Sequence, residues 1–141
     1  MIWHPELSNI QSEIPQSCTV HSHVWIGQDV PIGGGCKIQA FTFIPTGVSI
    51  GNNVFIGPRV TFTNDKYPPG EWSKTIVEDF VSIGAGAIIL PGITLGRGCM
   101  IGAGAVVTKS VPAGEVWVGN PARKLKSRIV DTSPEALDYF S

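Results

Sequence analysis

Large apolar side chains recur at every sixth position through most of the chain, and the residues between them are mainly small or polar. The first run of this pattern consists of Ile14, Val20, Ile26, Ile32, Ile38, Ile44, Ile50, Ile56 and Phe62. After an interruption, a second run consists of Val77, Ile83, Ile89, Leu95, Ile101 and Val107. An amphipathic helix would repeat every 3.6 residues, which this pattern does not do. A fixed period of this kind is typical of stacked, repetitive folds.

Each six-residue unit predicts a very short strand followed by a tight turn. Because positions two apart on a strand share a face, the large residue and the small residue two before it, such as Ile56 and Val54, both point inward. One unit cannot bury its apolar face alone, but three consecutive units close one triangular coil. Successive coils then stack in parallel about 4.8 Å apart. The sequence therefore predicts an all-β, parallel β-helix around one apolar column.

The three cysteines occupy the small inward position of this pattern. Cys18, Cys36 and Cys99 each lie two positions before a large apolar residue, and Cys18 and Cys36 are separated by one full coil of three units. They form no CxxC pair and show no metal-ligand spacing. Because a buried free cysteine behaves as a small apolar side chain, we expect all three to be structural.

Two pairs of outward positions are also apolar. Trp25 and Phe43 are separated by one full coil, as are Ile88 and Val106, so each pair should stack on an outer face of the prism. An exposed apolar row usually marks an interface. A prism with one apolar face can bury that face by closing into a cyclic trimer, so we expect a homotrimer.

The repeat is interrupted once. Phe62 and Val77 are 15 residues apart where six are expected, so nine residues are inserted, and we assign the loop to residues 63–76. Insertions in solenoids gather on the binding face. The loop carries adjacent Asn64 and Asp65 and the aromatic Tyr67. Asn and Asp are also ordinary turn formers, but we favour function because this is the only interruption in a regular series.

The repeat ends near Lys109 and is followed by a predicted loop through residues 117–121 and a tail over residues 122–141. The tail begins with a basic stretch, Arg123 to Arg128, which fits either a solvated terminus or a phosphate site. Ser133, Pro134 and Glu135 stand in the order of a helix start and predict a short helix over residues 134–140.

The length and net charge of the chain limit the number of domains and the classes of partner. A chain of 141 residues fits a single domain, 1–141. The formal net charge of -1 gives no electrostatic case for nucleic acid or for an anionic membrane. The sequence contains neither a membrane-spanning apolar run nor a signal-like start, so we expect a cytoplasmic protein.

Three segments, Ile83–Ile93, Ile101–Lys109 and Gly119–Arg123, carry a resemblance over nearly the whole chain to the left-handed β-helix hexapeptide acyltransferases, in the branch that uses acetyl-CoA. The left-handed sense rests on this resemblance, since parallel crossovers are right-handed in about 98% of cases. Phe62–Asp65 followed by Tyr67 and Pro68 is similar to the nucleotide-sugar N-acetyltransferases of surface-polysaccharide synthesis. Those enzymes acetylate an amino group on a dTDP- or UDP-linked hexose.

The resemblance implies a role for particular residues. Ala85 and Ala103 would offer backbone groups to the pantetheine arm of acetyl-CoA, Thr108 and Lys109 would lie near its adenosine, and Arg123 and Lys126 would meet its phosphates. In the loop, Asn64 would hold the attacking amine, Asp65 would take its proton or orient it, and Tyr67 would line the acceptor site. No metal is implied.

The histidines bear on the acceptor. O-acetyltransferases of this fold place a His in the loop as general base, whereas here Tyr67 stands at the matching position and the chain's histidines are His4, His21 and His23. A hydroxyl needs a base to become nucleophilic, and an amine needs less help. We therefore predict an acyl-CoA-dependent N-acetyltransferase that acts on a nucleotide-linked amino sugar. An O-acetyltransferase of a sugar or small alcohol and a non-catalytic β-helix scaffold are the alternatives. A carbonic anhydrase of this fold would need three His ligands for Zn²⁺, and we disfavour it because His21 and His23 are an i, i+2 pair and His4 precedes the repeat.

Overall fold

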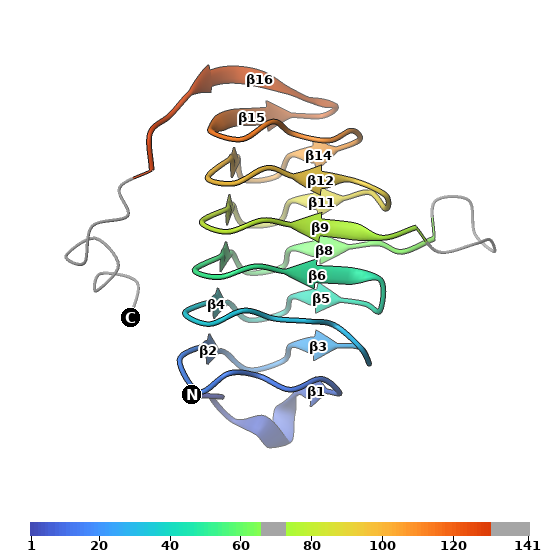
Figure 1. The fold of residues 1–141 in the computed structure, drawn as a ribbon. Coiled ribbons are helices and arrows are strands. Elements are labelled where there is room, and N and C mark those ends of the chain that lie inside the picture. The colour runs from blue at the N-terminus through green and yellow to red at the C-terminus, as the bar shows by residue number, and fades with distance from the viewer. Residues whose placement is uncertain (66–72, 131–141) are drawn as a thin grey trace.

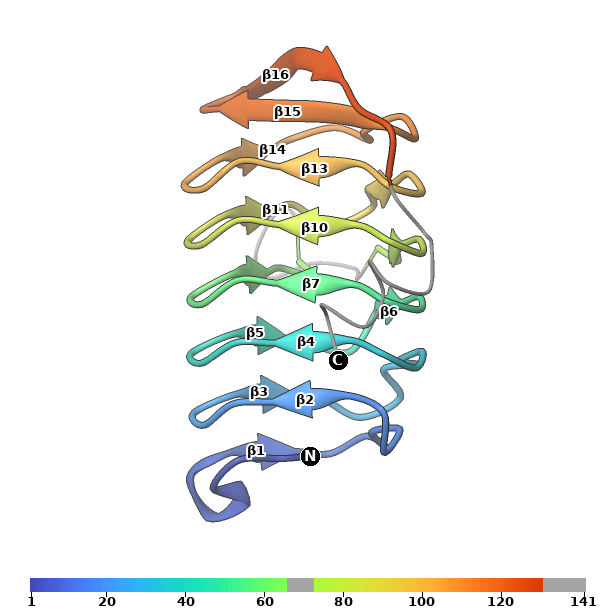
Figure 2. The same ribbon diagram turned by 90° about the vertical axis from the view of Figure 1, so that its left-hand side faces the viewer.

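The structure is a computed structural model that describes residues 1–65 and 73–130. The chain climbs in triangular coils whose sides are short strands, so that three sheets form the faces of a prism (Figure 1). In Figure 2 the strands that face the viewer run leftward as the chain climbs, which is the sense of a left-handed coil. The prediction of a left-handed parallel β-helix is confirmed.

Each sheet takes one side of the coils. Sheet A contains β2 (Thr19–Val20), β4 (Lys37–Ile38), β7 (Phe55–Ile56), β10 (Ser82–Ile83), β13 (Met100–Ile101), β15 (Glu115–Gly119) and β16 (Ala122–Ser127). Sheet B contains β1 (Asn9–Ile10), β3 (Trp25–Ile26), β5 (Phe43–Ile44), β8 (Thr61–Phe62), β11 (Ile88–Ile89) and β14 (Val106–Val107). Sheet C contains β6 (Val48–Ile50), β9 (Thr75–Val77) and β12 (Thr94–Leu95), and a 3-10 helix, η1 (Pro5–Leu7), precedes β1.

The turns between sheets stack into three vertical edges. The A/B corner joins sheet A to sheet B and contains Ala85 and Ala103. The B/C corner contains Thr46 and Asn64, and the C/A corner contains Phe80. Because a coil consists of three six-residue units where nothing is inserted, residues separated by three units lie above one another on the same corner.

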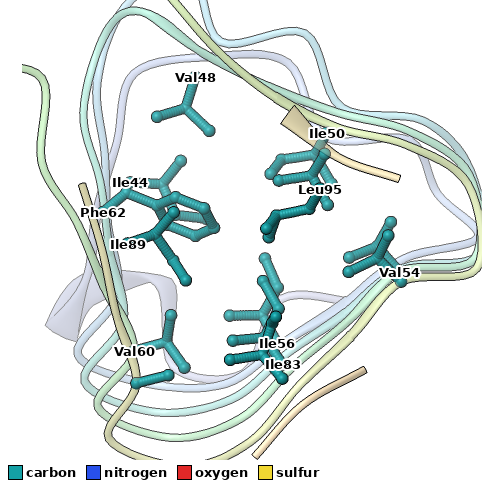
Figure 3. Close-up of a cluster of buried hydrophobic side chains, with 14 of the residues drawn as sticks. Ile44, Val48, Ile50, Val54, Ile56, Val60, Phe62, Ile83, Ile89 and Leu95 are labelled. Atoms are coloured by element: carbon teal, nitrogen blue, oxygen red, sulfur yellow. The ribbon is translucent and has the colours of Figure 1, made fainter. Parts of the chain in front are cut away.

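The predicted inward positions form the core. Ile44, Phe62 and Ile89 are fully buried and stack on the sheet B side of the interior, while Val54 fills the apex at the C/A corner (Figure 3). Ile14 and Ile32, one coil apart near the lower end of the solenoid, are only partly buried. The six-residue period therefore identifies the core correctly.

Close contact between coils explains why glycine follows so many inward residues. The backbone N–H of Gly84 donates to the carbonyl of Ile101 at 2.8 Å. A Cβ atom at Gly84 would lie 2.5 Å from the backbone nitrogen of Ala103, and one at Gly57 would lie 2.8 Å from that of Ala85. A side chain at either position would push two coils apart.

The upper end of the solenoid differs from the prediction of a loop through residues 117–121. Strand β15 instead continues sheet A, and β16 folds back on it as an antiparallel partner, with Val118 opposite Arg123. Trp117, 9% exposed, takes the place that an aliphatic residue holds in the lower coils, because its register partner on β13 is the inward Ile101. Its indole Nε1–H donates to Glu115 at 2.9 Å. The hairpin thus closes the upper end of sheet A.

The other predicted boundaries have mixed outcomes. The inserted loop is shorter at its end than the predicted 63–76, because Thr75 and Ile76 already belong to β9. Tyr67 and the predicted helix over 134–140 lie outside the described residues. Within residues 1–65 and 73–130 no helix has the length and apolar character needed to cross a membrane.

Replacing Gly84 by Ala tests the spacing between coils. The new Cβ would meet backbone rather than a movable side chain, so we expect Gly84→Ala to lower the free energy of unfolding by about 1–3 kcal/mol, the usual cost of overpacking. The control is Gly86→Asn, where φ is +73°, no atom lies within 4 Å of a built Cβ, and Asn tolerates the left-handed conformation. Urea unfolding of both variants measures the difference, and equal stabilities would contradict the packing argument.

Candidate active site

The inserted loop begins from a firmly held position on the B/C corner. The Asn64 side-chain amide Nδ2 donates to the carbonyl of Thr46 in the coil below at 2.9 Å. Thr63 donates to the Ile89 carbonyl in the coil above through both its backbone N–H and its hydroxyl, each at 3.1 Å. The Ser73 N–H donates to the Asn64 carbonyl at 3.4 Å, which joins the two ends of the loop.

These contacts decide which atom of Asn64 can take part in chemistry. Its Nδ2 is engaged by Thr46, and its Oδ1 cannot bind that carbonyl because both atoms are acceptors. Oδ1 is therefore the atom of the carboxamide that suits a donor such as an amine. Asp65, half-buried, follows at the mouth of the loop. Tyr67, the third predicted acceptor residue, is outside the described part of the chain.

The A/B corner carries an open surface of small residues, which we call the glycine shelf: Ala85, Gly86, Ala103 and Gly104. Both alanines are exposed. Gly86 and Gly104 have φ of +73° and +72°, and a Cβ built on either would meet nothing within 4 Å. The shelf spans two coils joined by a 2.8 Å hydrogen bond from the Gly104 N–H to the Ala85 carbonyl. An extended ligand could lie along it without displacing a side chain.

The β15–β16 hairpin lies above the shelf. Its turn stacks over the column of A/B corners at the left of Figure 2. Val118 lies next to Gly102, and its partner on β16 is Arg123. The exposed Arg123 therefore sits beside the upper end of the shelf. Lys126 is also exposed but pairs with Val116, toward the other end of β15.

Two further predicted coenzyme residues lie on the opposite edge of sheet B. Thr108 and Lys109 directly follow β14 and are exposed at the B/C corner, in the coil above Leu90. The structure thus brings Ala85, Ala103 and Arg123 together at one corner and places Thr108 and Lys109 at the next. Asn64 and Asp65 share the B/C corner with the latter pair.

Arg128, the last cation of the basic stretch, has a structural role. Its guanidinium donates to the carbonyls of Gly98 at 2.8 Å, Cys99 at 3.2 Å and Phe80 at 3.5 Å. Burial lowers the pKa of Arg128. These bonds tie the segment after β16 to the C/A corner, and nothing in the sequence distinguishes Arg128 from Arg123 in advance.

The cysteines are buried as predicted. Cys18, Cys36 and Cys99 are all fully buried, and burial raises the pKa of Cys36 and of Cys99 to about 12. The Cys36 thiol also donates to the Gly51 carbonyl at 3.1 Å. Because the thiolate is the nucleophilic form, Cys36 and Cys99 are chemically quiet near neutral pH.

The outward apolar pairs lie in one row on sheet B, as predicted. The rings of Trp25 and Phe43 stack with centroids 4.9 Å apart and an interplanar angle of 20°. Ile88 and Val106 are register partners higher in the same row, and Thr61 stands between the two pairs. Phe43 and Ile88 are each 39% exposed, so the row is open along one face of the prism.

A second row, which was not predicted from the sequence, lies on the A/B corner below the shelf. His23, Phe41 and Arg59 occupy the same turn position in three successive coils, and all have positive φ, at 60°, 64° and 60°. Their spacing was visible in the sequence, but turn positions of this kind are expected to hold glycine or asparagine. Within the described ranges, His, Cys, Asp and Glu side chains form no group of three or more that could hold a metal ion.

Residues 29–64 and 74–109, together just over half of the chain, match the family described as bacterial transferase hexapeptide (six repeats). The chain therefore belongs to the bacterial transferase hexapeptide family. The gap between the two matched segments coincides with the inserted loop.

Known proteins that are similar to the chain include two N-acyltransferases and an O-acetyltransferase. The 2,3,4,5-tetrahydropyridine-2,6-dicarboxylate N-acetyltransferase of Staphylococcus aureus is 43% identical over 89 residues, which cover 62% of this chain but only 37% of that enzyme. A mutant of AntD, an N-acyltransferase of Bacillus cereus in complex with dTDP-4-amino-4,6-dideoxyglucose and coenzyme A, aligns over 92% of this chain and 77% of its own, with a TM-score of 0.73 and 24% identity. A maltose O-acetyltransferase of Clostridium difficile aligns over 87% and 67%, with a TM-score of 0.56 and 30% identity.

Proposed function

We propose that the protein transfers an acetyl group from acetyl-CoA to the amino group of a nucleotide-linked amino sugar. The observation that carries this proposal is the glycine shelf, with Arg123 at its upper end, in a member of the hexapeptide transferase family. The complex of the similar N-acyltransferase with an amino sugar nucleotide and coenzyme A supports both substrates.

The shelf is suited to a long, thin coenzyme arm. A side chain at Gly86 or Gly104 would stand where we propose that the pantetheine lies, and both positions are empty of side chains. Arg123 beside the hairpin turn can form charge-assisted hydrogen bonds to the coenzyme phosphates. With the phosphates at this upper end, the thioester lies lower on the corner, nearer the level of the inserted loop.

The acceptor is an amine because the inserted loop contains no histidine. His21 and His23 lie in the coil of β2 and β3, two coils below Asn64, and His4 precedes β1. The neutral amine attacks the thioester carbonyl, the N–C bond forms, the C–S bond breaks, and the coenzyme sulfur leaves as a thiolate that takes up the proton released by nitrogen. Asn64 Oδ1 holds the amine, and Asp65 accepts or relays the proton.

The site is completed by a homotrimer. In one chain the shelf and Asn64 lie on opposite edges of sheet B, so they cannot contact the same pair of reacting groups. A cyclic assembly that buries the row of Trp25, Phe43, Ile88 and Val106 brings the A/B corner of one protomer beside the B/C corner of its neighbour.

Two observations keep a different acceptor open to test. The similarity to a maltose O-acetyltransferase favours a hydroxyl, and the Staphylococcus aureus relative, named for a dicarboxylate, favours an amine outside the sugars. The missing loop histidine favours our proposal over the first of these. A non-catalytic scaffold would give no reason for an open shelf beside Arg123.

Charge placed on sheet B should dissociate the trimer. Ile88→Glu puts a carboxylate into the proposed interface, whereas Ile76→Glu puts one on sheet C, where the native residue has a similar exposure of 42% against 39%. We expect sedimentation to give a trimer for the wild type and Ile76→Glu, and smaller species with lost activity for Ile88→Glu. A monomeric wild-type protein would remove the trimer model.

Removing the Arg123 side chain should weaken binding of the coenzyme. We expect Arg123→Ala to raise the KM for acetyl-CoA about tenfold or more, as for a lost hydrogen bond to a charged group, with a smaller effect on 3′-dephospho-CoA donors. Lys124→Ala is the control, because it removes the same charge from the same strand and Lys124 already pairs with Glu115 at 3.5 Å. Equal losses with both donors would place Arg123 away from the 3′-phosphate.

The acceptor assay tests the function itself. We expect thiol release from acetyl-CoA with nucleotide-linked amino sugars, and little with the hydroxyl counterparts.

Asn64→Ala should lose at least about tenfold in kcat/KM for the amino sugar, equivalent to about 1.4 kcal/mol of positioning. If Asp65 is the base, Asp65→Asn should cost on the order of 10²-fold. If the amine attacks unaided, Asp65→Asn should have little effect, and activity should rise with pH along the ionisation of the amine. Hydroxyl acceptors used as fast as amines would overturn the proposal.

A further inference from the structure

The row below the glycine shelf ends in an arginine. His23 and Phe41 stack with ring centroids 4.9 Å apart and an interplanar angle of 15°. The Arg59 guanidinium carbon lies 5.9 Å from the centroid of the Phe41 ring, in the next coil up. Because Phe41 has a neighbour in the coil below and another in the coil above, its ring supports Arg59 from beneath.

The column changes character directly above Arg59. The equivalent positions of the next two coils are Gly86 and Gly104, so no side chain of this column covers the guanidinium from above. Arg59 itself is exposed. Among residues 1–65 and 73–130, no carboxylate lies within 4.0 Å of its guanidinium. The lower end of the shelf therefore presents a positive charge that the described chain does not neutralise.

An arginine over a phenylalanine ring is also found on the C/A corner, in different surroundings. Arg97 lies over the ring of Phe80 at 5.0 Å, and Phe80 has φ of 61°, close to the value for Phe41. Arg97, however, lines a surface pocket together with two carboxylates, Glu78 and Asp79. The C/A corner is also covered, since a Cβ at Gly98 would lie 2.8 Å from Val130. Two carboxylates thus line the same surface as Arg97, although in the described chain neither lies within 4.0 Å of its guanidinium.

We propose that Arg59 binds a negatively charged oxygen group, phosphate or carboxylate, of the acceptor. This inference rests on the proposed function, in which the coenzyme phosphates lie at the Arg123 end of the shelf. The thioester then points toward Arg59, and the acceptor must approach from that side. A guanidinium matches the paired oxygens of a phosphate or carboxylate. Arg59 thus selects acceptors that carry such a group next to the reacting amine.

Three variants separate this role from a structural one. Arg59→Gln removes the charge and keeps the aliphatic stem, Arg59→Lys keeps the charge, and Arg97→Gln is the matched control. We expect Arg59→Gln to raise the KM for a nucleotide-linked amino sugar at least about tenfold, while the KM for acetyl-CoA changes less than about twofold. Arg59→Lys should recover part of the loss, and Arg97→Gln should match the wild type.

Acceptor chemistry and salt identify the bound group. A nucleotide-linked amino sugar, the same sugar without phosphates, and an amino dicarboxylate are compared in every variant. A rise in KM confined to the nucleotide-linked sugar would identify phosphate as the bound group. A rise confined to the dicarboxylate would identify carboxylate, and either result supports the proposal. Added salt should lower kcat/KM of the wild type more than that of Arg59→Gln.

Several results would overturn the inference without touching the proposed function. These are Arg59→Gln and Arg97→Gln behaving alike, or a rise in the KM for acetyl-CoA in place of the acceptor KM. Direct titration with the nucleotide-linked sugar covers the case in which no acceptor is turned over. A Kd about tenfold weaker in Arg59→Gln than in the wild type, for this sugar or for the amino dicarboxylate, would support the anion site even if the proposed reaction fails. Equal Kd values, or no binding, with both ligands would reject it.

Discussion

Hydrogen bonds between successive coils control what each position of this molecule can hold. The N–H of a residue in one coil donates to a carbonyl of the next at about the same short distance throughout, for example 2.9 Å from Phe55 to Val81 and 3.1 Å from Ser82 to Cys99. Neighbouring strands cannot separate without breaking such bonds, so a position that faces the adjacent backbone has no room for a side chain. Gly57 and Gly84 show this limit, since a Cβ at either would lie within 2.8 Å of a backbone nitrogen.

The same stacking arranges the residues in columns, and the proposed site residues of the A/B corner stand in them. The side chain of a residue on a corner packs against that of the equivalent residue in the next coil. On the A/B corner one column runs His23, Phe41, Arg59, Gly86 and Gly104, and its change from large to absent side chains creates the shelf. The β15–β16 hairpin bounds the shelf at its upper end and brings Arg123 over the corner.

The periodic part of the molecule could be predicted from the sequence because one rule fixes burial, pairing and stacking at once. Ile44, Phe62 and Ile89 follow that rule, and so does the outer pair of Trp25 and Phe43. The hairpin could not be predicted in this way, since it leaves the six-residue period and pairs strands that are antiparallel.

The site residues divide along the same line. Asn64 could be singled out because it begins the one insertion, but its bond to Thr46 depends on the register between coils. Arg59 was not predicted as a site residue because its exposed turn position carries no apolar signal. Its proposed role depends on an arrangement that the sequence does not show, with Phe41 below it and Gly86 above it. Arg123 and Arg128 read alike in the sequence, and only the course of β16 separates a cation beside the shelf from one bound to carbonyls.

A solenoid of this width imposes a further condition on catalysis. Side chains on one column reach their neighbours in that column, whereas the next corner lies across a full sheet. Groups that must act on the same atoms therefore have to share a corner or be brought together by a second chain. Here the shelf and Arg59 occupy the A/B corner, and Asn64 and Asp65 occupy the B/C corner. An apolar row covers the sheet between them, so burial of that row and assembly of a complete site are, in our proposal, the same event. The energy that joins the chains is then also the energy that positions the amine against the thioester.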